Sequence, residues 1–228
     1  LGNTSHLVQI PTNMIKDILK YGSDIITVYS YEKAVEISKE AEKLGIIQDI
    51  MFRVLDKNSN IYPGQEAGIE LQDLEYITKK IIKLKNLRIN GLTSFPCFLY
   101  NKSVKKIEKS ENTDVVLEAN NILKEKFGIN VREINLPSST CLENIKMIKE
   151  YGGTHGEPGH ALTGTTPFHV NDKAVEKPAY VYVSEISHNF RNKSYFYGGG
   201  YYRRSHMENV LIGDYYETLK KVKTTHFD

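Results

Sequence analysis

The sequence predicts an α/β protein, namely a TIM-type (β/α)8 barrel that lacks its first strands, followed by the start of a β-rich C-terminal domain. Three observations lead to this fold class. Apolar, β-branched segments alternate with segments of helical periodicity, which is typical of βαβ units around a parallel sheet. The turn after the first strand lacks the glycine fingerprint of a doubly wound fold. Beyond Pro167 short aromatic segments replace the alternation, so we expect domains at 1–168 and 169–228.

The elements of the barrel part follow one another in a regular order. Thr12 and Ser30 are expected helix N-caps, and Gly22 and Gly45 are expected helix stops. The expected strands are 5–11, 24–29, 49–56, 87–95 and 129–137, and the expected helices are 12–22, 30–45, 71–86, 112–128 and 141–153. In the last part the expected strands are 179–187, 194–204 and 209–214, and helical periodicity returns only in 215–223.

Two polar loops indicate which barrel strands these are. Residues 138–140 ("SST") follow one strand, and 154–164 ("THGEPGHALTG") occupy the place of the next strand and its loop. In a (β/α)8 barrel, phosphate commonly binds in the loops after strands seven and eight. With that assignment the visible units count back to strand three, and a wall without strands one and two cannot close. We therefore expect this chain to be a piece of a longer protein.

The composition disfavours several classes of function. The 30 Lys and Arg residues nearly balance the 28 Asp and Glu residues, which argues against nucleic acid or an anionic membrane as a partner. No apolar run approaches the ~20 residues of a membrane span, and no signal peptide is recognised. Cys97 and Cys141 lie far apart in the sequence, so we expect free thiols in a reducing cytoplasm. The histidines lack a compact ligand spacing, and no metal is expected.

Glu157 is the most informative single residue of the sequence. It lies where a strand end meets its loop, and for an isolated loop glutamate a capping or surface role is the ordinary interpretation. Here Gly159 and His160 follow, and a glycine lets the backbone approach an anion closely. The hydroxyl residues 138–140 precede a helix, a position suited to phosphate. An anion cradle beside a carboxylate suits pyridoxal phosphate, because the carboxylate keeps the pyridine nitrogen protonated.

The chain resembles the alanine-racemase-like, fold-type III pyridoxal phosphate enzymes, most closely their YhfX-like branch. The motifs that carry the resemblance are "GHALTG" after "EP", "GLTSFPC", "YPGQEAGIE" and "YFYGGGYYRRSHM", the last being the most specific. The resemblance implies a barrel followed by a β domain, bound pyridoxal phosphate, an amino-acid substrate and a homodimer. It also implies a Schiff-base lysine on the first barrel strand, which this chain does not include.

The resemblance implies roles for several residues. Glu157 takes the position of the pyridine-nitrogen partner, where alanine racemases proper have arginine, and this difference disfavours simple alanine racemisation. Ser138, Ser139, Gly159 and His160 match the phosphate-binding loops of the family.

Three further positions are candidates for contact with the ring or the substrate. Arg53 is a candidate partner of the cofactor's phenolic oxygen or of a substrate carboxylate, and a structural ion pair is an equally open interpretation. Phe95 falls where racemases have a ring-stacking histidine, although a core role is at least as common for phenylalanine. His188 is our candidate for the second catalytic group, because histidine is the side chain whose chemistry most often suits proton transfer near neutral pH. The alternatives in the same region are Glu185, Tyr197 and Tyr201.

Together these features favour a pyridoxal-phosphate-dependent amino-acid racemase, or a related enzyme that labilises the Cα–H bond. The chain by itself is expected to be inactive without the lysine. One alternative is a non-catalytic protein of pyridoxal phosphate binding or homeostasis, against which the tyrosine-rich C-terminal part argues. Another is a cofactor-free barrel enzyme that acts on a phosphorylated substrate, with Glu157 as its general base.

Overall fold

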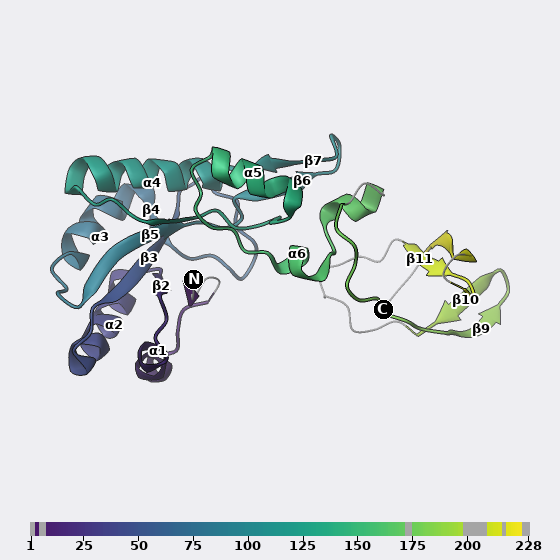
Figure 1. The fold of residues 1–228 in the computed structure, drawn as a ribbon, viewed down its shortest axis with the longest axis horizontal. Coiled ribbons are helices and arrows are strands. Elements are labelled where there is room, and N and C mark those ends of the chain that lie inside the picture. The colour runs from purple at the N-terminus through teal and green to yellow at the C-terminus, as the bar shows by residue number, and fades with distance from the viewer. Residues whose placement is uncertain (1–2, 5–7, 172–174, 198–208, 216–217, 225–228) are drawn as a thin grey trace. The chain divides into compact units, whose positions relative to one another are not determined.

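The computed structural model describes residues 3–4, 8–171, 175–197, 209–215 and 218–224. The chain divides into two units, Leu1–Ala179 and Tyr180–Asp228. The first unit contains a sheet with its helices, and the second contains antiparallel strand pairs (Figure 1). Among these described residues, no helix combines the length and apolar character that a membrane span requires.

The first unit is built on a parallel sheet. Its strands are hydrogen-bonded in the order β1–β2–β3–β5–β8, with β4 beside β3. An isolated parallel bridge between Asn135 and His155 continues the sheet beyond β8. The spatial order follows the chain order without reversal, as in a barrel wall and unlike a doubly wound sheet. The strands are β1 (Asn3–Thr4), β2 (Ile25–Val28), β3 (Gln48–Leu55), β4 (Ile69–Glu70), β5 (Leu87–Thr93) and β8 (Glu133–Asn135).

Helices connect the strands and pack against their neighbours in sequence. Contacts join α1 to α2, α2 to α3 and α3 to α4, as in the outer ring of a barrel (Figure 1). The apolar core lies between helices and strands and includes Phe52, Val54 and Leu123, all 0% exposed. The helices are α1 (Ile15–Tyr21), α2 (Tyr31–Leu44), α3 (Leu74–Ile81), α4 (Glu111–Phe127), α5 (Leu142–Glu150) and α6 (Gly159–Thr163), with 3-10 turns at Thr12–Met14, Leu71–Asp73 and Pro167–Asn171.

The helix ends follow the sequence signals in three of the four expected positions. The Ser30 hydroxyl accepts a backbone N–H in the first turn of α2 and caps it. Gly22 and Gly45 end α1 and α2 with φ of +84° and +66°, a conformation that favours glycine. The expected N-cap role of Thr12 is wrong, because Thr12 lies inside a 3-10 turn and its hydroxyl donates to Glu36 Oε2 at 2.9 Å.

Two segments of the first unit differ from the expectation. Residues 8–11 of the expected strand 5–11 are not a strand, and residues 5–7 lie outside the described part. Instead the Gln9 side chain donates to Thr27 O at 3.0 Å and accepts from Tyr29 N at 3.3 Å, replacing backbone pairing with β2. An antiparallel hairpin, β6 (Phe98–Asn101) with β7 (Lys106–Lys109), also follows β5. Both strands have only four residues, and β7 is lysine-rich, so no clear apolar alternation marks the hairpin in the sequence.

The second unit contains two described antiparallel pairs. Strand β9 (Ile186–Phe190) pairs with β10 (Lys193–Phe196), and β11 (Asn209–Ile212) pairs with β12 (Lys220–Lys223). The helix expected at 215–223 is wrong, because Val222 pairs with Val210 across the second of these hairpins and strand pairing overrides helical propensity. Residues 198–204 of the expected strand 194–204 lie outside the described part.

Candidate functional site

A row of buried polar side chains crosses the sheet at the carboxyl ends of its strands. Strand register places Arg53 beside Thr93, Thr93 beside Asn135, and Asn135 beside His155. Arg53, Thr93 and Asn135 are only 3%, 0% and 2% exposed. Buried polar groups cost free energy unless they are hydrogen-bonded, so the partners of this row define what the site can do.

Glu157 joins this row from the loop that follows His155. Asn135 Nδ2 donates to Glu157 Oε1 at 2.8 Å and to Thr93 Oγ1 at 3.2 Å. Burial raises the pKa of the Glu157 carboxyl, and the hydrogen bond from Asn135 lowers it by a smaller amount. The carboxyl group therefore lies in a partly desolvated place beside a fixed donor, with its pKa raised from the usual value.

The turn between β8 and α5 has an unusual backbone. Ser138 and Ser139 have φ of +90° and +50°, a left-handed conformation that costs a non-glycine residue about 1–3 kcal/mol. The hydroxyl of Ser139 donates to the Phe98 carbonyl at 3.3 Å. No described residue accepts a hydrogen bond from the backbone N–H of Ser139 or Thr140. The turn therefore presents free donors beside strained backbone, a combination common at ligand sites.

Thr140 joins this turn to the glutamate. Its Oγ1 accepts from Glu157 N at 3.0 Å, and the residue is 6% exposed. Gly156 packs against the same side chain, since a Cβ at Gly156 would lie 3.0 Å from Thr140 Oγ1 and 2.8 Å from Ile148 Cδ1. The donors of the turn and the Glu157 carboxylate therefore belong to one closely fitted unit.

Arg53 is enclosed by neutral groups. Its Nη1 donates to the Tyr29 hydroxyl at 3.3 Å, its Nη2 donates to Gln65 O at 2.9 Å, and its guanidinium carbon lies 5.1 Å from the Tyr29 ring centroid. No ion pair of Arg53 is found in the described part of the chain. Burial raises the pKa of the Tyr29 hydroxyl. The hydrogen bond and the positive charge of Arg53 lower this pKa, and the negative charge of Glu157 raises it. Tyr29 is thus electrostatically coupled both to Arg53 and to Glu157.

The remaining expected residues of the first unit lie near this group or along its loops. The Phe95 ring is half-buried and lies 5.7 Å from the Tyr62 ring at a tilt of 54°. Gly159 is the first residue of α6, and a Cβ there would meet nothing within 4 Å. His160 is the second residue of α6, and its side chain lies outside the described part of the structure.

His188 belongs to the second unit, whereas the row of buried polar side chains belongs to the first. It lies in β9, is exposed, and stacks on Tyr195 with ring centroids 4.7 Å apart. The Ser187 hydroxyl lies 2.9 Å from His188 Nδ1. Of the alternatives, Glu185 and Tyr197 are exposed, and Tyr201 lies outside the described residues.

A second cluster of ionisable groups lies at the N-terminus of α5. One ligand atom each of Cys141, Glu143 and Glu176 lies within 4.8 Å of the others. Glu176 Oε1 accepts from Leu142 N at 2.8 Å, and Glu143 lies in the first turn of the helix. Carboxylates near a helix N-terminus are stabilised by the helix dipole, which accounts for the placement of Glu143 and Glu176 beside α5. Burial raises the pKa of the Cys141 thiol to about 11, which keeps it protonated.

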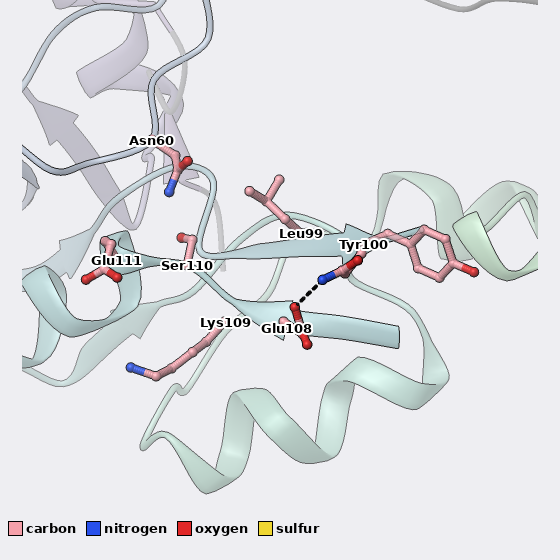
Figure 2. Close-up of a pocket in the computed structure, with 8 residues that line it drawn as sticks. Asn60, Leu99, Tyr100, Glu108, Lys109, Ser110 and Glu111 are labelled. Carbon is pink, nitrogen blue, oxygen red and sulfur yellow. Dashed lines mark hydrogen bonds between the residues drawn. The ribbon is translucent and has the colours of Figure 1, made fainter. Parts of the chain in front are cut away.

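A shallow hollow of about 340 Å³ lies beside the β6–β7 hairpin (Figure 2). Within it Asn101 Nδ2 donates to Glu108 Oε2 at 2.8 Å, and Lys109 forms an ion pair with Asp114. These groups satisfy one another, and none of the expected site residues contributes to the lining. The residues that line the hollow are Asn60, Leu99, Tyr100, Asn101, Glu108, Lys109, Ser110 and Glu111.

Sequence reasoning missed several members of the site, and Tyr29 and Asn135 are instructive examples. Tyr29 follows β2 and Asn135 ends β8, so both occupy the carboxyl end of a barrel strand, where this fold places its functional side chains. That position is the signal that could have found them.

Comparison with known proteins assigns both parts of the chain. The family model described as the alanine racemase N-terminal domain matches residues 5–167, and the model of the YhfX-like C-terminal domain matches 181–228. The protein YhfX of Escherichia coli (strain K12), itself described as uncharacterized, is 42% identical over 212 residues. The match covers 93% of this chain and 54% of YhfX, so the chain spans about half the length of that relative.

Solved structures share the fold at low sequence identity. An alanine racemase of Clostridium difficile 630 matches with a TM-score of 0.54 and 19% identity, covering 76% of this chain and 42% of its own. PipY of Synechococcus elongatus PCC7942 matches with a TM-score of 0.50 and 17% identity, covering 66% of this chain and 65% of its own. The matched families agree with the structure, which has a parallel barrel sheet followed by a β-rich segment. The chain therefore belongs to the alanine-racemase-like family of fold-type III pyridoxal phosphate proteins.

Proposed function

We propose that the protein to which this chain belongs is a pyridoxal-phosphate-dependent enzyme that labilises the Cα–H bond of an amino acid, as a racemase or a related enzyme. The observation that carries the proposal is the position of Glu157. Its carboxylate is held by Asn135, and its backbone N–H is bonded to Thr140 of the donor-rich turn. A carboxylate and an anion cradle built into one unit suit a ligand with a basic ring nitrogen at one end and a phosphate at the other.

The donor set fits pyridoxal phosphate. The backbone N–H groups of 138–140, with Gly159 and His160, would hold the phosphate, and Glu157 would hold a proton at the pyridine nitrogen. Asn135 Oδ1 is buried and has no hydrogen-bond partner in the described part of the chain, as expected beside a ligand-binding position. When bound, pyridoxal phosphate supplies an electron sink for the carbanion left after Cα–H cleavage.

The other residues supply orientation and proton transfer in this proposal. Arg53, a buried cation without an ion pair to any described residue, would bind an anionic oxygen, either the cofactor's phenolic oxygen or a substrate carboxylate. Phe95 would contact the face of the ring, and His188 would move the proton at Cα. A homodimer in the cytoplasm completes the proposal, and the two free, buried thiols Cys97 and Cys141 are in keeping with a reducing compartment.

The principal alternative is a protein that binds pyridoxal phosphate without catalysis. The match of 181–228 to a YhfX-like C-terminal domain argues against this alternative, because we expect non-catalytic pyridoxal phosphate proteins to be single barrels without a second domain. The alternative makes a different prediction, namely cofactor binding without Cα–H exchange.

The experiment uses the protein at the full length of its relatives. After loading with pyridoxal phosphate and borohydride reduction, peptide mapping should find the cofactor on a lysine N-terminal to Leu1. The loaded protein is then incubated in D2O with individual amino acids, and NMR measures deuterium at Cα. Failure to bind pyridoxal phosphate would overturn the proposal, and binding without exchange in any amino acid would favour the non-catalytic alternative. Glu157→Arg should retain the cofactor and slow exchange, whereas an unchanged rate would remove Glu157 from its role.

A further inference from the structure

We infer that Asn144 is a positioning residue that holds the 138–140 turn in its phosphate-binding conformation; this inference rests on the proposed function. Asn144 lies in α5 and is 0% exposed. Its Nδ2 donates to both Ser138 O and Ser139 O, each at 3.2 Å. One buried amide thus binds the carbonyls of the two residues that have left-handed backbone conformations.

The left-handed conformations need such support. A serine at positive φ is less stable than the same residue in an extended or right-handed conformation, and two in succession persist only when their surroundings fix them. The Ser139 hydroxyl contributes a contact of 3.3 Å to Phe98 O, at the long end of the hydrogen-bond range. Asn144 supplies two bonds to the backbone itself. It therefore contributes two of the four described side-chain hydrogen bonds that hold residues 138–140, and both reach the strained backbone.

The geometry of the peptide bond links these two bonds to anion binding. Both peptide bonds are trans, so each C=O and the N–H of the following residue point in opposite directions. Because Asn144 draws the carbonyls of Ser138 and Ser139 toward α5, the N–H groups of Ser139 and Thr140 point away from α5. Neither of these two N–H groups has a described acceptor. Asn144 thereby orients two adjacent donors for one anion, and the anion assigned to them is the cofactor's phosphate.

The choice of residue fits this role. A primary amide has two N–H donors on one planar nitrogen, which suits two neighbouring carbonyls. Asn144 Oδ1 is buried without a partner in the described part of the chain, which costs stability. An aliphatic side chain would avoid that cost but would leave both carbonyls unbound. The asparagine at this position therefore supplies donors that an aliphatic side chain lacks.

The test compares two ligands of the full-length protein, pyridoxal phosphate and pyridoxal, which lacks the phosphate. Asn144→Ala should raise the Kd of pyridoxal phosphate about tenfold or more and leave the Kd of pyridoxal unchanged. Asn144→Ser, which keeps one donor and fills less space, should give an intermediate Kd and serves if the alanine variant folds poorly. Asn90→Ala is the matched control, because Asn90 is a buried asparagine that bonds Asp49 away from the turn.

Glycine at the strained positions provides the rescue. Glycine adopts positive φ readily, so the Ser138→Gly, Ser139→Gly protein needs less support from Asn144. In that background Asn144→Ala should raise the Kd by a smaller factor than in the wild-type background. If wild-type protein binds no pyridoxal phosphate, the proposed function fails. If the wild-type protein binds pyridoxal phosphate and both Asn144 variants keep the wild-type Kd, the positioning role is wrong. It is also wrong if the variants raise the Kd of pyridoxal as much as that of pyridoxal phosphate, or if glycine at 138 and 139 does not reduce the effect of Asn144→Ala.

Discussion

The side chains of Asn135 and Glu157, 22 residues apart in the sequence, are joined by a hydrogen bond of 2.8 Å. The same amide nitrogen reaches Thr93 Oγ1 at 3.2 Å, so both of its hydrogens face acceptors. This orientation supports the charged form of the carboxyl, whereas burial favours the neutral form. The balance between these two effects sets how readily Glu157 holds a proton.

Asn135→Ala should raise the pKa of Glu157 further. The variant removes the hydrogen bond that opposes the effect of burial, so the neutral carboxyl is favoured. NMR titration of glutamate side-chain carboxyls in the cofactor-free protein measures the change, with Glu157→Gln identifying the resonance. Asn90→Ala removes a buried amide elsewhere and should leave that titration unchanged. An unaltered Glu157 titration in Asn135→Ala would show that the 2.8 Å bond has no influence on the carboxyl.

Glu157→Gln should make the cofactor-free protein more stable than wild type at neutral pH. The folded-state pKa of Glu157 is raised above its ordinary value of 4.5, so the folded state binds the proton more tightly than the unfolded state. Stability from this group is therefore fully present below the ordinary pKa and is lost as pH rises through the raised value. Glutamine does not titrate and still accepts the bond from Asn135. Urea midpoints should thus diverge above this window and converge below it, and a constant difference at all pH values would contradict the assignment.

Tyr29→Phe should destabilise the protein by about 1–3 kcal/mol, because it leaves a buried N–H of the Arg53 guanidinium without its acceptor. Urea unfolding measures the change. In an Arg53→Met background the same substitution should cost less, since the donor is gone. Tyr21→Phe, at a tyrosine that is 89% exposed, is the control and should have little effect. An equal loss of unfolding free energy in both backgrounds would mean that the hydrogen bond from Arg53 to the Tyr29 hydroxyl does not contribute to stability.

Local signals made much of the fold predictable. Ser30, Gly22 and Gly45 act on their own helix ends, and the alternation of strands and helices is visible without long-range information. The pairing of Asn135 with Glu157, by contrast, depends on strand register, since β8 brings together residues that no local pattern connects. Strand pairing likewise overrides the helical pattern near Val222.

The same distinction applies within the candidate site. Glu157 and the serines of 138–140 were expected from their residue types beside glycines and a helix start. The left-handed backbone of Ser138 and Ser139 was not, because it is maintained by Asn144, a buried side chain with nothing unusual in its own sequence neighbourhood. A residue type indicates what a site contains, whereas the supporting contacts depend on tertiary packing.

Gly156→Ala and Gly159→Ala should separate stability from cofactor binding. A Cβ at Gly156 would lie 2.8 Å from Ile148 Cδ1 and 3.0 Å from Thr140 Oγ1, so we expect a loss of about 1–3 kcal/mol in unfolding free energy as these side chains move. The displaced Thr140 hydroxyl would also weaken its bond to Glu157 N. A Cβ at Gly159 meets nothing within 4 Å, so that variant should unfold at the wild-type urea concentration. Because Gly159 is proposed to let the backbone approach the phosphate, the same variant should bind pyridoxal phosphate more weakly. If Gly159→Ala keeps the wild-type affinity for pyridoxal phosphate, this glycine is not part of the phosphate site. If Gly156→Ala keeps the wild-type stability, Thr140 and Ile148 can move aside without a loss of unfolding free energy.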